Sequence, residues 1–255
     1  MLELNQLYLM DCMEGMKGYS DATFDLIITD PPYNVHYNEK STHLAKHGKA
    51  RDKQISRDKH FKDVFNDYSG FCKELYRLTK QMAHVYLFCA EKQIPEWFLN
   101  MENAGFKFNN IIICAKNKQS LDMTYGLKYS YKTEICLFYR KGNKKLNFLG
   151  ESNLMNCPTG TSLIHPTEKP ISLIRYFMRQ SANPGDVVLD PFMGSGTTAV
   201  AALDEHLDFG GFEISPEYYK IANKRIEVHK KRPKPFFTDK KLAVRAPKQK
   251  GFFDK

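Results

Sequence analysis

The sequence predicts a single α/β domain, and three observations support that class. The chain has 255 residues, of which 42% are hydrophobic and 13% aromatic, so it can bury a full core and leaves room for a small appended lobe. Short apolar runs typical of buried strands alternate with segments of helical periodicity. Residues 187–214 read as a strand, a glycine-bearing turn, a helix start and a second strand, an order typical of α/β proteins.

Apolar runs along the chain predict seven strands. The first, residues 4–10, alternates loosely between apolar and polar residues and ends at an acid, Asp11, which we expect to point into a ligand crevice. The later runs are mostly continuous, as in strands buried on both faces. The predicted strands end near Asp11, Asp30, Cys89, Ala115, Tyr139, Asp190 and Ile214.

Apolar residues at helical spacing predict the helices between these strands. Two further signals set the bounds of one of them: Pro95 stands where proline favours the first turn, and Gly105 stands where glycine commonly ends a helix. The helices predicted by spacing cover residues 61–80, 94–104, 171–182 and 218–229.

The segment Asp30-Pro31-Pro32-Tyr33 follows the apolar run 24–28 and has the composition of a site. Neither proline has a backbone N–H, so Asp30 and Pro31 present only acceptors, while Tyr33 offers a flat aromatic face. That combination suits a planar group that bears an amine. A strand followed by a Pro-Pro turn with a half-buried tyrosine is the alternative that these residues alone leave open.

A glycine-bearing turn, residues 190–199, follows the sixth predicted strand. Gly194 and Gly196 let the backbone approach a ligand closely, and the helix that follows offers N–H groups to an anionic group. The turn lacks the Gly-Lys-Thr of a P-loop, which argues against ATP. Glu213 ends the next strand, where an acid can accept hydrogen bonds from both ribose hydroxyls. Together these residues predict an adenosine-containing cofactor.

Basic residues concentrate in three segments, 34–60, 107–145 and 229–255, although the formal net charge of the whole chain is only +9. In residues 229–255, for example, ten Lys and Arg stand against two acids. Basic segments on an otherwise acidic body favour a polyanionic partner. A basic tail that serves only solubility is the alternative for the last segment.

Residues 116–132 interleave lysines with tyrosines, as in segments that stack bases and neutralise phosphates. A surface loop whose tyrosines pack on the core is equally compatible with this pattern. With the irregular segment 34–60 and the turn-rich segment 141–164, these residues are the expected recognition loops, and none of them contains a helix-turn-helix or finger pattern.

Composition and spacing also exclude several classes. No apolar run approaches the roughly 18 residues of a membrane span, and no signal pattern is present, so we expect a cytoplasmic protein that does not bind membranes. The six cysteines include no C-x-x-C pair, which indicates neither disulfides nor a zinc cluster. His43 and His47 have the spacing of a helical metal pair, but no third ligand accompanies them and no metal site is predicted.

Three motifs closely resemble those of the DNA amino-methyltransferases, which transfer methyl from S-adenosylmethionine to adenine N6 or cytosine N4. They are Asp30-Pro31-Pro32-Tyr33, the stretch from Asp190 to Thr198, and the segment 165–170, His-Pro-Thr-Glu-Lys-Pro. Their order is similar to the permuted beta group. The resemblance covers about residues 3–230, so domain bounds of 1–230 with a basic tail at 231–255 are expected.

The resemblance implies a Rossmann-like class I methyltransferase fold with a seven-stranded mixed sheet covered by helices on both faces. It also implies roles for residues. Asp30, Pro31, Pro32 and Tyr33 would be catalytic, with Asp30 also beside the cofactor. The methionine and ribose part of the cofactor would lie against Asp190, Phe192, Gly194, Ser195, Gly196 and Thr197. Glu213 would hold the ribose, Asp11 the adenine amine, and Thr167 with Lys169 the methionine carboxylate.

The activity implied is methylation of adenine N6 in double-stranded DNA, with the target base flipped onto Tyr33. Adenine is favoured because cytosine members of the family more often carry Ser in place of the acid at Asp30, so cytosine N4 stays an alternative. RNA and protein-amide methyltransferases usually resemble Asn-Pro-Pro-Tyr, from which this chain departs. A non-catalytic protein that binds cofactor and nucleic acid is a further alternative. A homodimer and a cognate restriction endonuclease are potential partners.

Overall fold

The structure is a computed structural model that describes residues 1–33, 66–116, 129–157 and 168–231. The strands are β1 (Gln6–Leu9), β2 (Phe24–Thr29), β3 (Thr79–Cys89), β4 (Lys107–Lys116), β5 (Thr133–Lys141), β6 (Leu154–Cys157), β7 (Val187–Asp190) and β8 (Asp208–Glu213). The helices are α1 (Cys12–Met16), α2 (Tyr68–Leu78), α3 (Ile94–Ala104), α4 (Ile171–Ser181), α5 (Thr197–Asp204) and α6 (Pro216–Lys230), and a 3-10 turn, η3 (Glu91–Gln93), precedes α3.

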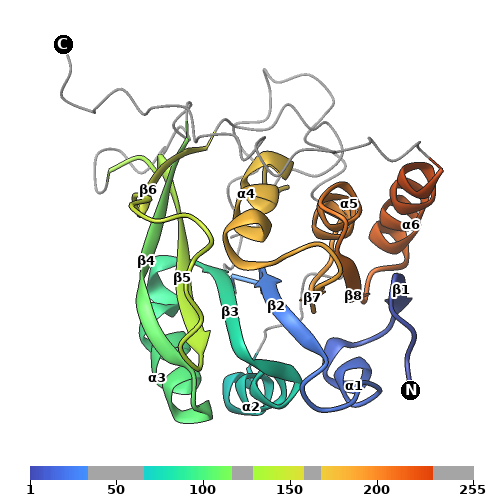
Figure 1. Ribbon diagram of the computed structural model, residues 1–255, viewed down its shortest axis with the longest axis horizontal. Coiled ribbons are helices and arrows are strands. Elements are labelled where there is room, and N and C mark those ends of the chain that lie inside the picture. The colour runs from blue at the N-terminus through green and yellow to red at the C-terminus, as the bar shows by residue number, and fades with distance from the viewer. Residues whose placement is uncertain (34–65, 117–128, 158–167, 232–255) are drawn as a thin grey trace, which may run out of the picture.

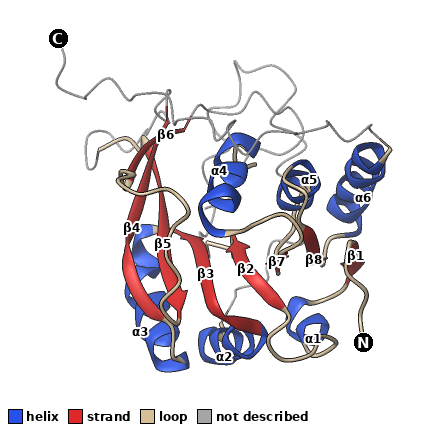
Figure 2. Ribbon diagram, in the orientation of Figure 1, coloured by secondary structure: helices blue, strands red, loops and turns tan. Residues whose placement is uncertain are grey.

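All these strands form one mixed sheet in the order β1-β8-β7-β2-β3-β5-β4-β6 (Figure 2). The neighbours from β1 to β3 are parallel, as expected for strands joined by helical crossovers. β5 lies antiparallel to both β3 and β4, and β6 pairs parallel to β4 at the edge. The α/β class and the mixed sheet predicted from the sequence are therefore confirmed.

The described residues contribute eight strands to the sheet, so the predicted count of seven is wrong. The strand that the sequence missed is β6, which lies inside the segment 141–164 expected to be a polar recognition loop. Its four residues, Leu-Met-Asn-Cys, are too few to show an apolar period of their own. Their strand conformation comes from pairing with β4, in which Ile113 lies opposite Leu154 and Lys116 opposite Cys157.

Most predicted elements occur in the structure with shifted bounds. β3 begins at Thr79, inside the predicted helix range 61–80, because Thr79 pairs with Phe24 before an irregularity shifts the register. Helix α3 spans the predicted residues and ends at Gly105, whose φ of 110° is one that glycine adopts readily. Helix α2 begins at Tyr68, and the earlier part of the predicted helix over 61–80 includes residues outside the described ranges.

Helices cover both faces of the sheet, α1 to α3 on one side and α4 to α6 on the other (Figure 1). Each face has its own apolar core. In β2, Leu26 and Ile28 point into the core beneath α4, α5 and α6, whereas Ile27 points into the core beneath α1, α2 and α3. This alternation is what a strand buried on both faces requires, and it explains why the run was continuously apolar.

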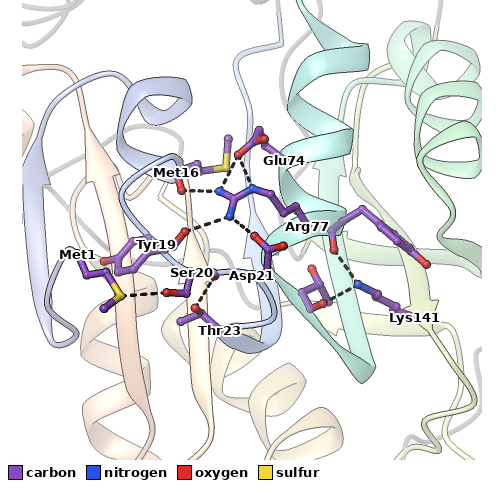
Figure 3. A network of polar contacts seen from close by, with 11 residues as sticks. Met1, Met16, Tyr19, Ser20, Asp21, Thr23, Glu74, Arg77 and Lys141 are labelled. Atoms are coloured by element: carbon purple, nitrogen blue, oxygen red, sulfur yellow. Dashed lines mark hydrogen bonds and ion pairs between the residues drawn. The ribbon is translucent and has the colours of Figure 1, made fainter.

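An arginine fixes the connection that leads into β2 (Figure 3). The Arg77 guanidinium, from the last turn of α2, donates to the carbonyls of Met16 and Tyr19 at 2.9 and 3.0 Å and pairs with Asp21 and Glu74. Five N–H groups in a planar fork suit this set of acceptors. The amino end of β2 is thereby anchored on α2. The site described below lies at the other end of this strand.

Candidate active site

Four acids lie close together at the carboxyl ends of neighbouring parallel strands, because each of them ends or follows one of these four strands. Asp190 ends β7 and Glu213 ends β8, while Asp30 directly follows β2. Asp11 comes two residues after β1, and the Met10 N–H donates to the Glu213 carbonyl at 3.1 Å, which brings Asp11 beside Glu213. The crevice outside the carboxyl ends of parallel strands is where α/β sheets bind ligands. The sequence predicted all four acids as site residues.

Asp190 closes the glycine-bearing turn from inside. One carboxyl oxygen accepts the Phe192 N–H at 3.1 Å, and the other accepts the Thr198 hydroxyl at 2.6 Å. Burial raises the pKa of Asp190 to about 7, although both donors act in the opposite direction. The side chain therefore joins the first residues of the turn to the first turn of α5.

Gly194 and Gly196 give the turn its open surface. Both have positive φ values, 55° and 87°. A Cβ atom on Gly194 would meet only the Phe192 carbonyl oxygen, at 4.0 Å, so the backbone there faces open space. A Cβ on Gly196 would lie 3.0 Å from the Ala222 Cβ on α6. Glycine at 196 thus allows the turn to pack on α6, whereas glycine at 194 leaves backbone accessible to a ligand.

Two acids next to this turn also support the backbone. The Glu213 oxygens accept the Gly194 N–H at 2.9 Å and the Ser215 N–H at 2.8 Å, and burial raises its pKa. A carboxylate has lone pairs to spare after two such bonds, so Glu213 retains capacity for ribose hydroxyls. Asp11 is exposed and caps α1 by accepting the N–H groups of Met13 and Glu14. Sequence reasoning missed this capping role.

Arg225 on α6 is a further residue of the turn that the sequence did not indicate as functional. Its guanidinium donates to the Ser195 carbonyl at 2.7 Å and to the Ser195 hydroxyl at 3.0 Å, and it pairs with Glu168 at 2.8 Å. Glu168 also accepts the Thr197 hydroxyl at 2.8 Å. An arginine between the buried positions Ala222 and Ile226 was the available signal. This clamp joins Ser195 and Thr197 to the segment that carries Lys169.

The predicted catalytic acid, Asp30, is paired with Lys169. The Lys169 ammonium lies 2.5 Å from Asp30 Oδ2, 3.2 Å from the Tyr33 hydroxyl oxygen and 3.5 Å from Glu134 Oε2. Glu134 is also in contact with the Tyr33 hydroxyl at 3.4 Å and pairs with Lys116. The structure brings Lys169 into contact with Asp30, and its contact with a cofactor carboxylate stays a prediction.

The charged groups of this cluster shift the pKa values of one another. Burial acts to lower the pKa of Lys169, but Asp30 and Glu134 raise it above its usual value. Burial acts to raise the pKa of Glu134, but Lys169 and Lys116 lower it on balance. Burial and the neighbouring carboxylates raise the pKa of Tyr33 well above its usual value, so its hydroxyl stays neutral.

One oxygen of Asp30 is left available. Asp30 Oδ1 is buried and has no hydrogen-bond partner among the described residues. Pro31 is buried, and the Pro32 carbonyl accepts the Gln93 side-chain N–H at 3.1 Å. Gln93, which also bonds to the Tyr68 hydroxyl, comes from η3 and was not predicted. A buried acceptor without a donor costs free energy. A hydrogen-bond donor from a ligand would remove this cost at Oδ1.

Several predicted residues lie outside the described ranges: Thr167, the pair His43 and His47, the loop 34–60, most of 116–132 and the tail beyond residue 231. Residues 141–157 are described, and part of this segment packs on the protein body. The Asn147 side chain donates to the carbonyls of Arg179 and Ala182 at the end of α4, in addition to the β6 pairing.

In the described ranges no helix is long and apolar enough to span a membrane. They also contain no group of three or more His, Cys, Asp or Glu that could hold a metal ion. All six cysteines fall within these ranges and are free and buried.

The sequence matches the DNA methylase family for adenine N6 and cytosine N4 over residues 24–224. It is 27% identical over 258 residues to the DNA adenine methyltransferase YhdJ of Escherichia coli (strain K12), covering 86% of this chain and 81% of that protein. The crystal structure of the M1.HpyAVI-SAM complex is similar at 26% identity, with a TM-score of 0.64 and coverage of 86% of this chain and 98% of that chain.

The PvuII DNA methyltransferase, which is cytosine-N4-specific, shares the fold at 18% identity, with a TM-score of 0.67 and coverage of 88% of this chain and 89% of that chain. The family match covers more than half of the chain and includes β2 with Asp30, the glycine-bearing turn and Glu213. The chain belongs to the DNA methylase family, whose fold is Rossmann-like and whose methyl donor is S-adenosylmethionine.

Proposed function

We propose that this protein methylates the N6 amine of adenine in double-stranded DNA, with the target base flipped out of the helix. The single observation that carries the proposal is Asp30, whose Oδ1 is buried without a partner among the described residues at the carboxyl end of β2. The strand next to it, β7, leads into the open glycine-bearing turn. An acceptor for an amine and a cradle for a methyl donor therefore lie on adjacent strands.

The chemistry follows from the acceptors on this strand end. The exocyclic amine of adenine shares its lone pair with the ring and is a poor nucleophile while planar. Hydrogen bonds from its two protons to Asp30 Oδ1 and to the Pro31 carbonyl favour a pyramidal nitrogen, whose lone pair is free to attack. S-adenosylmethionine supplies the electrophilic methyl group. As the nitrogen–methyl bond forms, the sulfur–methyl bond of the donor would break and S-adenosylhomocysteine would leave, and the proton of the resulting cationic nitrogen passes to Asp30 or to water.

Lys169 fits this scheme as the group that orients the acid. Its ammonium occupies Asp30 Oδ2, so the other oxygen is the one left for the target amine. A charge-assisted hydrogen bond restricts the carboxylate rotamer more than a neutral one does. Tyr33, whose hydroxyl is held by Lys169 and Glu134, would present its ring to the flipped base.

The cofactor is proposed to lie across the glycine-bearing turn. The open backbone at Gly194 allows close approach, and Glu213 retains acceptor capacity for the ribose. Among the described side chains none caps the N-terminus of α5, whose N–H groups suit a carboxylate. Ser195, Gly196, Thr197 and Phe192 complete the turn. We propose Asp11 for the adenine amine, as its place beside Glu213 supports.

The choice of base is what the test must decide. Purified protein, duplex DNA and methyl-labelled S-adenosylmethionine would be incubated, and the digested nucleosides separated by mass. N6-methyladenine is the expected product. N4-methylcytosine, the modification that matches the specificity of the PvuII enzyme, would identify cytosine as the target instead. Absence of label in DNA would leave the non-catalytic alternative.

The residue that carries the proposal is tested in the same assay. Asp30→Ala should bind S-adenosylmethionine with an affinity near that of the wild type and lose methyl transfer by about 100-fold or more, because an acceptor used in the transition state is gone. Glu14→Gln, which changes an exposed acid on α1, is the control and should keep full activity. Wild-type rates in Asp30→Ala would contradict the assignment.

A homodimer, a cognate endonuclease and a cytoplasmic location remain predictions.

A further inference from the structure

Glu134, near the start of β5, contacts the cluster around Asp30 but belongs to none of the motifs that the sequence singled out. Its Oε2 atom lies 3.5 Å from the Lys169 ammonium and 3.4 Å from the Tyr33 hydroxyl, and Oε1 pairs with Lys116 at the end of β4. A single carboxylate thus touches residues from both the Asp-Pro-Pro-Tyr motif and the segment 165–170.

We propose that Glu134 is a positioning residue for methyl transfer: it holds the Lys169 ammonium between two carboxylates and offsets the charge of that ammonium beside the reacting amine. The inference rests on the proposed function, because it assigns Glu134 a part in that reaction. It adds a residue from a strand that sequence reasoning did not connect with the site.

Glu134 affects the position of the Lys169 ammonium. An ammonium has three N–H donors, and Lys169, only 9% exposed, directs them among Asp30, Tyr33 and Glu134. If the Glu134 charge were absent, Asp30 would be the remaining carboxylate of this cluster that attracts the ammonium. Lys169 would then compete more strongly with the target amine for Asp30. The second carboxylate therefore helps to keep Oδ1 available.

Glu134 also affects the net charge of the cluster. Asp30 and Glu134 supply two carboxylates, and Lys169 and Lys116 supply two ammonium groups, so the four charges balance. Methyl transfer makes the amine nitrogen cationic. A neutral cluster does not oppose that cation, whereas a cluster with an excess positive charge would, at close range and away from bulk water. Neutralising Glu134 alone creates such an excess.

The substitution Glu134→Gln tests the proposal, because glutamine keeps the shape and a carbonyl acceptor but removes the charge. We expect kcat at saturating duplex DNA to fall about 10- to 100-fold, the range of a lost electrostatic contribution in an active site. The dissociation constant for S-adenosylmethionine and the thermal midpoint should stay near the wild-type values. Glu14→Gln is the matched control, with the same change of charge in an exposed acid–lysine pair.

A double variant separates the charge from a merely structural role. Glu134→Gln combined with Lys116→Met restores the balance between one carboxylate and one ammonium, so kcat should recover several-fold relative to Glu134→Gln alone. A structural role predicts that the double variant is no better than the single one. That result, or a kcat within about twofold of the wild type for Glu134→Gln, would overturn the proposal while the proposed function stands. If the wild-type protein itself transfers no methyl to DNA, the proposed function fails and the role of Glu134 fails with it.

Discussion

Replacing Arg225 by methionine removes the clamp between α6 and the glycine-bearing turn. The guanidinium makes two hydrogen bonds to Ser195, at 2.7 and 3.0 Å, and an ion pair with Glu168 at 2.8 Å. Methionine keeps much of the length and apolar stem of the arginine, so the variant tests the polar contacts more than the packing. Two properties should change together: the stability of the fold and the affinity for S-adenosylmethionine.

The expected loss of stability in Arg225→Met depends on how deeply the two charged partners are buried. The Glu168 side chain is 7% exposed and that of Arg225 is 23% exposed. Removing one partner of a fully buried pair costs about 3–5 kcal/mol, and the partial exposure of Arg225 reduces the expected loss to about 2 kcal/mol. Glu168 would keep its bond to Thr197, so the fold should survive. The turn would lose its anchor at Ser195, and we expect cofactor affinity to fall about tenfold, or about 1.4 kcal/mol.

Urea unfolding measures the free energy of unfolding, and calorimetric titration with S-adenosylmethionine measures the affinity. Lys224→Met, an exposed neighbour on α6, is the matched control and should change neither by more than about 0.5 kcal/mol. Glu168→Gln added to Arg225→Met should recover part of the stability, because it removes the buried charge that Arg225 no longer neutralises. Equal stability and affinity in Arg225→Met and Lys224→Met would refute the clamp.

Two further predictions concern the same turn. Burial raises the pKa of Asp190 to about 7, above about 4 for an unfolded aspartate, so the bound proton stabilises the fold at low pH and this contribution is lost as the pH rises through 7. Asp190→Asn cannot ionise, and its free energy of unfolding in urea should fall less than that of the wild type between pH 5 and 8; parallel pH profiles would contradict the assignment. Both glycines have positive φ, so an alanine at either position should cost about 1–2 kcal/mol of stability. Gly196→Ala should cost more than Gly194→Ala, because only at 196 does the new methyl group approach Ala222, at 3.0 Å. Gly194→Ala should instead weaken cofactor binding in a titration, and an affinity equal to that of the wild type would show that the open backbone does not serve the cofactor.

Much of the fold could be predicted from the sequence, because buried strands and amphipathic helices leave periodic patterns. The run ending at Ile28 and the helix closed by Gly105 are examples, and both occur as expected. β6 could not be predicted, since four residues carry no period and their conformation depends on a neighbour about 40 residues earlier in the chain. The early start of β3 at Thr79 depends likewise on its pairing with Phe24.

Some residues of the candidate site could likewise be predicted from the sequence, and others could not. Asp30, Asp190 and Glu213 could be predicted because each comes at the carboxyl end of an apolar run, and the structure places β2, β7 and β8 side by side. Arg225 and Gln93 could not, because each contacts the site through hydrogen bonds to backbone that is distant in sequence. Propensity and spacing do not identify the partners of such contacts. For Arg225, the local hint was its position between the buried residues Ala222 and Ile226 of α6.

Glu134 escaped prediction for a topological reason. In a parallel sheet, residues of a site come from the carboxyl ends of strands, and a search of those ends finds Asp30 and its neighbours. β5 runs antiparallel to β3, with Ile135 opposite Cys89. The amino end of β5 therefore lies beside the carboxyl ends of β2 and β3. Glu134 therefore reaches the site from the beginning of a strand, beside Lys116 at the end of β4. In mixed sheets of this kind, the first residues of an antiparallel strand belong in the search for site residues along with the last residues of its parallel neighbours.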